Sequence, residues 1–367
     1  MQLALAAPLN AARGYPSADF EAALERARAL GQGLGDTGAV VRSLVGLFTV
    51  HFVRGDIRRS FELAEGALTL GGPHASLLPA SHYAMAGALT SLGEGLRARD
   101  HFERAISLYE RQGSHPVLPG LDVLVFSAAW AAHALWLLGY PDQAVERSRQ
   151  AIAWAEHLGL PHSLTMAHAY AALTRQFRRD RDAGRSHAES VMTLCSTYGF
   201  AYYREWGTII QGWAASHERP EDGAATIRQG LANLRGLGAE ARRPYYLSLL
   251  AEAVVNAGRT EEARSILDDA RATAAQNSDV WWLPELDRLR GTLADSPEEW
   301  FERALELARS QAAKSLELRA AVGLARLWKE RGAAAQARAL LTPVYGWFTE
   351  GYDTTDLIEA RALLAQL

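Results

Sequence analysis

The chain has 367 residues, with 38 basic and 42 acidic side chains and a formal net charge of -4. This length exceeds what one globular core usually holds, so it predicts either several domains or an elongated repeat array. The nearly balanced charge gives no field toward phosphate backbones or anionic lipid, so we expect no nucleic acid and no membrane as partner. Cys195 is the only cysteine, which excludes an intrachain disulfide and a thiolate metal cluster and favours a cytoplasmic location.

The composition favours helices along the whole chain. Hydrophobic residues make up 49%, alanine and arginine are abundant, and β-branched residues are few. No stretch alternates polar and apolar residues as a strand would. Residues 1–14 resemble half of a helical unit with no polar capping helix before it. We expect an incomplete first unit that either forms a homodimer or was once covered by further sequence.

A repeat of about 40 residues runs through the chain. Short turns after apolar helices recur, with one double-length gap, at Gly55, Gly93, Gly139, Arg179, Glu218, Gly258 and Gly332. Five residues after each turn a usually small side chain begins an apolar stripe, as in Ala144, Ser148 and Ala151. This is the A-x3-F spacing of the second helix of a tetratricopeptide (TPR) unit, where a small residue lets two helices approach closely.

The segment Leu121 to Tyr140 is almost long enough to span a membrane. It contains Asp122 and His133, lacks flanking basic residues and is rich in alanine, so a spanning helix is not favoured. We predict a helix that is buried on most of its sides inside a solenoid.

The double-length gap is predicted to hold another helix pair. Ser296 and Pro297, followed by two glutamates, have the chemistry of a helix start, so a pair is expected between Val280 and Ala312. The amphipathic stretch from Thr354 to Leu367 is expected to be a C-terminal capping helix. Together these patterns predict an all-α fold over 1–367: a single TPR-like α-solenoid, a right-handed superhelix of about nine antiparallel helix pairs.

No catalytic machinery is legible in the sequence. The only lysines are Lys314 and Lys329, and neither follows a glycine-rich turn, so a P-loop is excluded. The histidines form no HExxH motif and no set with carboxylates at metal-ligand spacing. We therefore expect no enzyme, no catalytic residue, no metal and no cofactor. The basic pairs beginning at Arg58, Arg178 and Arg242 are interpreted as solvated residues at helix ends.

Several stretches resemble the C-terminal TPR region of large bacterial signalling ATPases. They are LWLLGYPDQA (135–144), WGTIIQGWA (206–214), residues 228–253, ELRAAVGLARLW (317–328) and VYGWFTEGYDTTDLIEARALL (344–364). In those proteins an adenylate/guanylate cyclase or LuxR-type DNA-binding domain precedes an ATPase module, and the TPR array follows. The resemblance implies a sensor or partner-docking region, whereas cyclase, DNA-binding and ATPase sequences are absent from these 367 residues.

The first helices of a TPR array line its concave face, where a partner peptide usually lies. Positions thirteen, ten, six, three and two residues before a turn are expected to face this groove. The candidate partner-binding residues, with Trp282 and Glu285 added by analogy, are His133, Trp136, Tyr245, Ser248, Glu252, Asn256, Trp282, Glu285, Arg319, Arg326 and Lys329. The alternative for the aromatic members is that they belong to the core between repeats.

The leading hypothesis is a protein-interaction or sensor scaffold of a bacterial signalling system that binds a peptide or a partner domain. A further expected partner is an ATPase or cyclase module, upstream or in trans. The alternative is a domain that senses a small-molecule effector for a cyclase, an ATPase or a transcriptional regulator. A closed apolar pocket near Trp136 or Trp282 would favour the effector, and an open polar trough would favour the peptide. An enzyme would need titratable groups with shifted pKa values clustered in a cleft.

Overall fold

The computed structural model describes residues 15–112 and 122–367. Within these ranges the regular elements are α-helices and one short 3-10 helix at Ala75–Leu77, so the all-α prediction is confirmed. The α-helices are α2 (Ala18–Leu34), α3 (Thr37–Val53), α4 (Ile57–Gly71), α5 (Leu78–Ser91), α6 (Gly95–Gln112), α7 (Val123–Leu137), α8 (Pro141–Leu158), α9 (Pro161–Phe177), α10 (Arg181–Tyr198), α11 (Ala201–Ala215), α12 (Pro220–Gly236), α13 (Arg243–Asn256), α14 (Thr260–Asn277), α15 (Leu283–Thr292), α16 (Glu298–Ser310), α17 (Lys314–Glu330), α18 (Ala334–Tyr345) and α19 (Thr355–Leu364).

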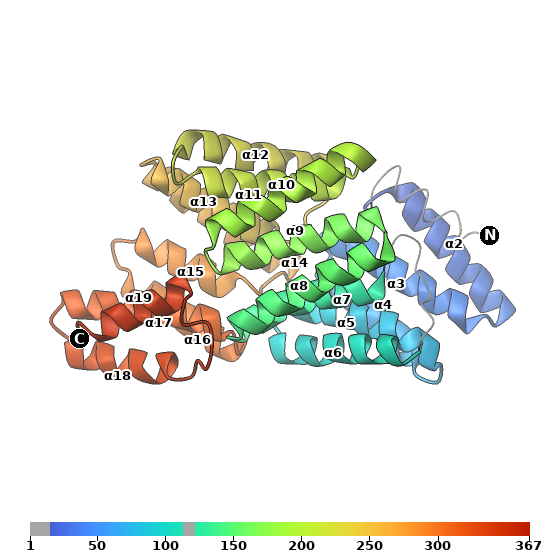
Figure 1. Ribbon diagram of the computed structural model, residues 1–367, viewed down its shortest axis with the longest axis horizontal. Coiled ribbons are helices and arrows are strands. Elements are labelled where there is room, and N and C mark those ends of the chain that lie inside the picture. Colours follow the sequence, from blue (N-terminus) through green and yellow to red (C-terminus); the bar gives the residue numbers. More distant parts are fainter. Residues whose placement is uncertain (1–14, 113–121) are drawn as a thin grey trace.

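Consecutive helices form hairpins that stack side by side (Figure 1). Eight hairpins, α3/α4 through α17/α18, lie within the described residues; α2 precedes the first and α19 packs on the last. Each helix contacts mainly its neighbours in the sequence, which confirms the TPR-like α-solenoid. The pair predicted between Val280 and Ala312 is α15 with α16. The predicted half unit at 1–14 lies outside the described residues.

The small residues of the repeat lie where paired helices touch. Ala144, Ala263 and Ala337 are fully buried near the starts of α8, α14 and α18. At Gly223 of α12 the approach is so close that an added Cβ would lie 2.6 Å from the carbonyl oxygen of Gly212 in α11. This contact leaves no space for a side chain, which explains glycine at this point of the second-helix pattern.

Helix α7 is apolar around its whole circumference and is covered by its neighbours in the array. Every residue from Val125 to Leu137 is buried. The helix begins at Asp122, whose Oδ1 accepts a hydrogen bond from the Val125 amide at 2.9 Å while Oδ2 accepts one from the Tyr109 hydroxyl at 2.7 Å. Across the described ranges, no helix combines the length and the apolarity needed to cross a bilayer.

The superhelix is wound so tightly that one turn rests on the next. The last backbone carbonyls of a helix have no partner within that helix. In α3, α5 and α7 such a carbonyl accepts a hydrogen bond from a segment five hairpins further along the chain, and in α9 from a segment four hairpins further along. The contacts run from Val53 to the amide of Glu240 (2.9 Å), from Ser91 to the amide of Val280 (2.8 Å), from Trp136 to the hydroxyl of Ser315 (2.5 Å) and from Phe177 to the guanidinium of Arg319 (2.5 Å).

The turns that end α3, α5 and α7 also press against the next superhelical turn. An added Cβ would lie 2.8 Å from Asn277 at Gly55, 2.9 Å from Gln311 at Gly93 and 2.5 Å from Trp347 at Gly139. Gly332 has the same position in the hairpin α17/α18 and the same positive φ, yet no atom lies within 4 Å of its added Cβ. In the early repeats the turn glycine is therefore required for two reasons: its positive φ, and the close packing between superhelical turns.

The interior enclosed by the superhelix is packed with aromatic side chains around a buried arginine. Arg242 is 2% exposed, and its guanidinium carbon lies 5.1 Å from the ring centroids of both Trp130 and Tyr170 and 5.3 Å from that of Trp206. Its Nη1 lies 3.2 Å from Nδ1 of His133. These cation–π contacts offset part of the cost of removing the guanidinium from water.

The interpretation of the arginine pairs as solvated helix-end residues is wrong at two positions. Arg242 does stand at the start of α13, in a left-handed conformation with φ 61°, but its side chain turns into the core. Arg178 follows α9 and is 9% exposed because it forms ion pairs with Asp142 at 2.9 Å and Asp353 at 3.3 Å. Arg178 is covered by the later segment that carries Asp353, whereas Arg242 points back against the rings of earlier helices.

Two histidine pairs occupy the same register in alternate hairpins. The Nδ1 atoms of His82 in α5 and His101 in α6 are 2.8 Å apart, and those of His168 in α9 and His187 in α10 are 3.1 Å apart. Burial, reinforced by the partner histidine, lowers the pKa of His82 to about 4 and that of His187 to about 4. One neutral imidazole in each pair can donate to the other, whereas two protonated rings would repel each other.

The effect of packing between superhelical turns can be measured by substituting the turn glycines. Gly332→Ala should lower the free energy of unfolding by about 1 kcal/mol, the cost of a left-handed conformation for alanine. Gly139→Ala should lower it by roughly 2 to 4 kcal/mol, because its Cβ also meets Trp347 across the superhelix. Urea unfolding followed by circular dichroism provides the comparison, and equal losses in the two variants would contradict the described contact.

The histidine pairs should make stability depend on pH. The pKa values of His82 and His187 are lower in the folded chain than the ordinary value of about 6.5 in an unfolded one, so protons bind preferentially to the unfolded state. The free energy of unfolding should therefore fall between pH 6.5 and pH 4, by an amount on the order of 1 to 3 kcal/mol. The double variant His82→Asn/His187→Asn should flatten this slope, and His157→Asn, at an exposed position in α8, should leave it unchanged.

Candidate functional site

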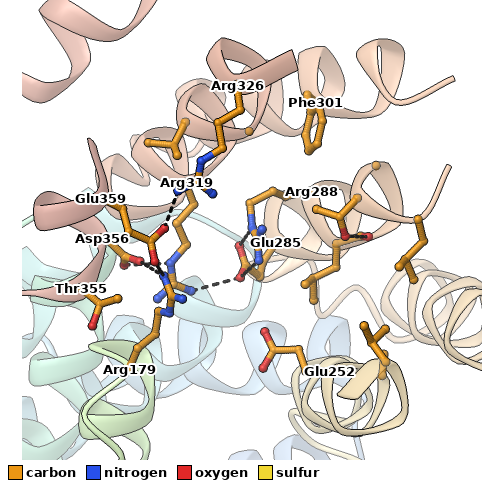
Figure 2. Close-up of a pocket in the computed structure, with 18 of the residues that line it drawn as sticks. Arg179, Glu252, Glu285, Arg288, Phe301, Arg319, Arg326, Thr355, Asp356 and Glu359 are labelled. Carbon is orange, nitrogen blue, oxygen red and sulfur yellow. Dashed lines mark hydrogen bonds and ion pairs between the residues drawn. The ribbon is translucent and has the colours of Figure 1, made fainter. Parts of the chain in front are cut away.

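A cavity of about 740 Å³, partly open to solvent, lies between the ends of α9 and α11 and the helices α13, α15, α17 and α19 (Figure 2). It is the principal pocket within the described parts of the chain. Leu289 of α15, Phe301 of α16 and Val322 of α17 give it an apolar side. Its remaining wall is charged and comes from segments that the superhelix brings together from distant parts of the sequence.

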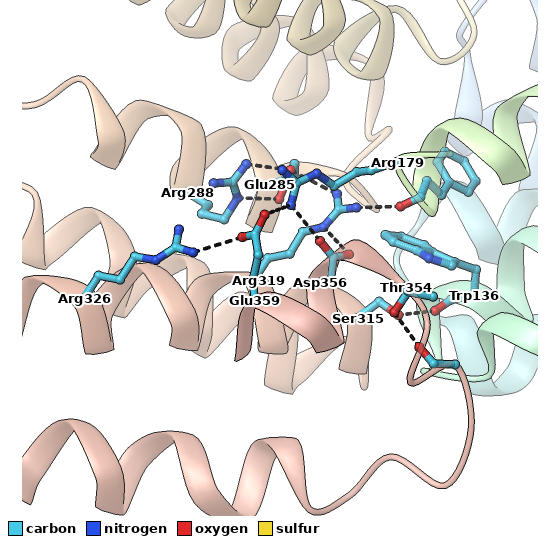
Figure 3. A network of polar contacts seen from close by, with 12 residues as sticks. Trp136, Arg179, Glu285, Arg288, Ser315, Arg319, Arg326, Thr354, Asp356 and Glu359 are labelled. Carbon is cyan, nitrogen blue, oxygen red and sulfur yellow. Dashed lines mark hydrogen bonds and ion pairs between the residues drawn. The ribbon is translucent and has the colours of Figure 1, made fainter. Parts of the chain in front are cut away.

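Arg319 is the central residue of the charged wall (Figure 3). Its Nε donates to Asp356 Oδ2 at 2.9 Å, Nη1 to Glu285 Oε1 at 3.1 Å and Nη2 to the carbonyl oxygen of Phe177 at 2.5 Å. The guanidinium carbon lies 4.9 Å from the ring centroid of Trp136. Burial alone would lower the pKa of Arg319, but the two carboxylates outweigh it and raise that pKa, so the guanidinium is permanently charged.

Glu285 is held on its other side by Arg288, one turn further along α15. Arg288 Nε and Nη2 donate to the two carboxylate oxygens of Glu285 at 2.8 and 2.9 Å, in a bidentate arrangement. Burial would raise the pKa of Glu285, but the positive charges of Arg288 and Arg319 lower it to about 2. Glu285 is therefore a charged structural group at neutral pH.

The last helix closes the wall with Glu359. This carboxylate forms ion pairs with Arg179 at 2.9 Å and with Arg326 at 3.0 Å. Arg179 also reaches Asp356 at 3.2 Å, so the end of α9 is joined to α19 by two acidic side chains. Burial raises the pKa of Glu359, but the two arginines lower it overall. The ion pairs thus connect α9, α17 and α19 around one side of the cavity.

Glu252 of α13 differs from these paired acids. Its carboxylate points into the cavity, and within the described parts of the chain no hydrogen bond or ion pair ends on it (Figure 2). Burial is the largest influence on its pKa and raises it, and the nearby charge of Glu285 raises it further. Arg288 and Arg319 act in the opposite direction without reversing the shift. Glu252 is the half-buried acid of this wall whose charge is left uncompensated by a direct partner.

Five of the eleven candidate residues line this cavity. They are Glu252, Asn256, Glu285, Arg319 and Arg326. They come from α13, α15 and α17, whose inner faces were expected to form one groove. Lys329 lies apart, where its Nζ donates to Gln366 Oε1 at 2.6 Å.

The other five candidates are packed in the interior. Tyr245 donates its hydroxyl to Gln176 Oε1 at 2.9 Å, and Ser248 Oγ accepts a hydrogen bond from Trp282 Nε1 at 2.9 Å. His133, Trp136 and Trp282 are at most 2% exposed. The inner wall is thus a solid core at these positions, and neither Trp136 nor Trp282 lines the cavity. The polar, partly open cavity corresponds to the feature expected for a peptide.

Sequence reasoning missed Arg179, Arg288, Asp356 and Glu359. Arg179 takes the turn position occupied by glycine in most repeats and keeps a positive φ of 60°. Asp356 and Glu359 are three residues apart on α19, so they share one helix face. Two signals in the sequence were available. One is an arginine at a turn that favours glycine, and the other is an acidic face on a helix that was expected only to cap the array.

The wall is suited to recognising a polar chain. Its paired carboxylates are held ionised by arginines, so they are poor general acids at neutral pH. Across the described residues, no three histidine, cysteine, aspartate or glutamate side chains are arranged to hold a metal ion. The cavity offers apolar surface, fixed charges of both signs and, at Glu252, an unpaired acid that is half-buried.

Comparison by sequence finds one distant relative of interest. No protein-family model matches the chain. An uncharacterized protein of Rhizobium meliloti (strain 1021) is 25% identical over 241 residues, which cover 63% of this chain and 23% of that protein. The chain therefore spans less than a quarter of the length of this relative.

Comparison by structure supports the repeat architecture. A Rap protein complexed with Competence and Sporulation Factor has a TM-score of 0.67 and 12% identity, covering 100% of this chain and 98% of that chain. The Rap conjugation gene regulator of the plasmid pLS20, in complex with the Phr* peptide, has a TM-score of 0.56 and 10% identity, covering 89% of this chain and 95% of that chain. The apo form of the quorum sensor NprR from B. thuringiensis has a TM-score of 0.53 and 14% identity, covering 94% of this chain and 96% of that chain. At these identities the likeness shows the fold alone: this chain has the all-helical TPR-like fold of these proteins.

Proposed function

We propose that this chain is a regulatory scaffold of a bacterial signalling system that binds a peptide, or an extended segment of a partner protein, in the cavity described above. The observation that carries the proposal is the cavity itself. It measures about 740 Å³, is partly open, and is lined by charged and apolar side chains from the first helices of successive repeats. This volume falls within the range of ligand-binding pockets, and the inner face of a TPR array is where such proteins hold peptides.

The structural neighbours support a peptide as the ligand. One protein of similar fold is complexed with the Phr* peptide, and another is a quorum sensor. In this chain a small effector has no closed apolar site at the predicted aromatics, because Trp136 and Trp282 are packed against Phe177 with ring centroids 5.0 and 5.5 Å away. An extended chain with polar groups matches the mixed wall better than a compact apolar molecule does.

The proposed role is non-catalytic and cytoplasmic, and it belongs to a larger signalling assembly. The resemblance to TPR regions of signalling ATPases suggests that an ATPase or cyclase module, in the same polypeptide or in trans, receives the signal. The far greater length of the Rhizobium meliloti relative supports this setting. The concave-face residues that we propose to contact the peptide are Glu252, Asn256 and Arg326, which line the cavity and remain at least partly accessible.

A variant that occludes the cavity tests the proposal. Asn256 is exposed and lines the cavity, so Asn256→Trp should reduce peptide binding at least tenfold by filling the space without disturbing the core. Ala232→Trp, at an exposed position on α12 outside the cavity, is the matched control. Affinity selection of a random hexapeptide pool, followed by fluorescence polarisation of the selected peptides, gives the dissociation constants.

Retention of defined peptides by the wild-type chain and the Ala232→Trp variant, with loss in Asn256→Trp, would support the proposal. A wild-type chain that enriches no peptide, or an Asn256→Trp variant that binds as tightly as wild type, would refute it. Circular dichroism of both tryptophan variants checks that the helical array is intact.

A further inference from the structure

Glu252 is the starting point, because the other half-buried acids that line the cavity already have arginine partners. Glu285 is paired with Arg288 and Arg319, while Asp356 and Glu359 are bound by arginines of α9 and α17. Glu252 faces the same space, and no ion pair to it exists within the described chain. Among the half-buried acids of the wall, Glu252 is therefore the one that is still available.

The nearby arginines are not free to serve Glu252. Arg288 is engaged in its bidentate contact with Glu285. Arg319 uses Nε, Nη1 and Nη2 on three different acceptors and is fixed against the ring of Trp136. Moving either arginine to Glu252 would leave Glu285 or Asp356 with an uncompensated charge in a half-buried place, which costs more than it returns. With these two arginines engaged, Glu252 is left open to a cation from a bound ligand.

The environment of Glu252 favours a charged group on an apolar stem. The carboxylate is partly removed from water, so an ion pair formed there is screened less than one on the surface. Leu289, Leu318 and Val322 line the same cavity and provide apolar surface. The methylene groups of a lysine or arginine side chain can cover such surface while the charged end reaches an acid.

We infer that Glu252 is a specificity-determining residue that receives a primary amine or a guanidinium of the bound peptide. This inference rests on the proposed function, since it names the chemistry that the peptide must carry. It assigns the other charged groups of the wall, apart from Arg326, a structural role, which is to hold α9, α15, α17 and α19 together around that contact. A peptide without a cation would still meet the apolar side of the cavity and would bind more weakly.

The test uses two positional-scanning libraries of hexapeptides with amidated C-termini, selected on the full chain. In the first library the N-terminus is acetylated, so a cation can come only from a side chain. In the second the N-terminus is free, so the α-amino group is also available. Wild-type protein should enrich lysine or arginine at one position of the first library. Where the α-amino group is the cation, the protein should instead bind peptides of the second library more tightly than their acetylated counterparts.

The variants isolate the contribution of Glu252. Glu252→Gln keeps the shape of the side chain and should weaken binding of a selected basic peptide about tenfold, while its affinity for the analogue with norleucine or citrulline in place of the basic residue should stay the same. Glu252→Asp keeps the charge and should retain most of the preference. Glu65→Gln is the control, because Glu65 is exposed on α4 outside the cavity, and it should leave the affinity unchanged.

The outcomes separate the two proposals. If wild type selects peptides without any preference for a cation, or if Glu252→Gln binds the basic peptide as tightly as wild type, the inference is overturned while peptide binding stands. If wild type retains no peptide from either library, the proposed function fails, and the inference fails with it. A loss confined to the basic peptide in Glu252→Gln supports both.

Discussion

The contact between successive turns of the superhelix is the constraint on which the rest of the structure depends. Carbonyls at the ends of α3, α5, α7 and α9 accept hydrogen bonds from segments four or five hairpins later. In an open solenoid these groups would face water. Here the hydrogen bonds between turns hold the inner face of the early repeats against the N-terminal ends of the first helices in later hairpins. The space that the superhelix encloses is therefore filled by aromatic side chains.

The cavity lies where this packing ends. The last of the four contacts joins Phe177 to Arg319, and Arg319 is also the centre of the charged wall. Beyond it, within the described residues, the inner faces of α13, α15 and α17 border the cavity together with α19. The same interaction therefore closes the core on one side and forms the wall of the pocket on the other.

The local sequence pattern was sufficient to predict the repeated helix pairs. It was not sufficient to predict which side chains are buried in the interior of the superhelix. Turn glycines such as Gly139 and small residues such as Ala144 report contacts within a hairpin or between neighbours, so their spacing predicts each helix pair. The burial of Arg242 depends on aromatic residues from α7, α9 and α11, and no periodicity relates those positions to it. For the same reason His133 was assigned to a groove, although it lies in the core.

The candidate site was predicted in part, because the register identifies a face but does not say what covers it. Glu285, Arg319 and Arg326 were placed on the inner face, and the structure brings them to one cavity. Their partners Asp356 and Glu359 belong to a helix whose sequence indicates only a terminal cap. Arg179 could not be matched to either acid, since 177 residues separate it from Asp356 along the chain.

One register position illustrates how local space decides the role of a residue. Six residues before the turn, α5 has Gly87 and α13 has Glu252. At Gly87 the ring of Trp130 comes within 2.8 Å of where a Cβ would be, so a side chain has no room there. At Glu252 the corresponding space is the cavity, and a carboxylate extends into it. In α17 the same position is Arg326, whose guanidinium crosses to Glu359. The side chain at this register position thus points inward in each hairpin. The winding of the superhelix determines whether it meets the core, the cavity or an ion-pair partner.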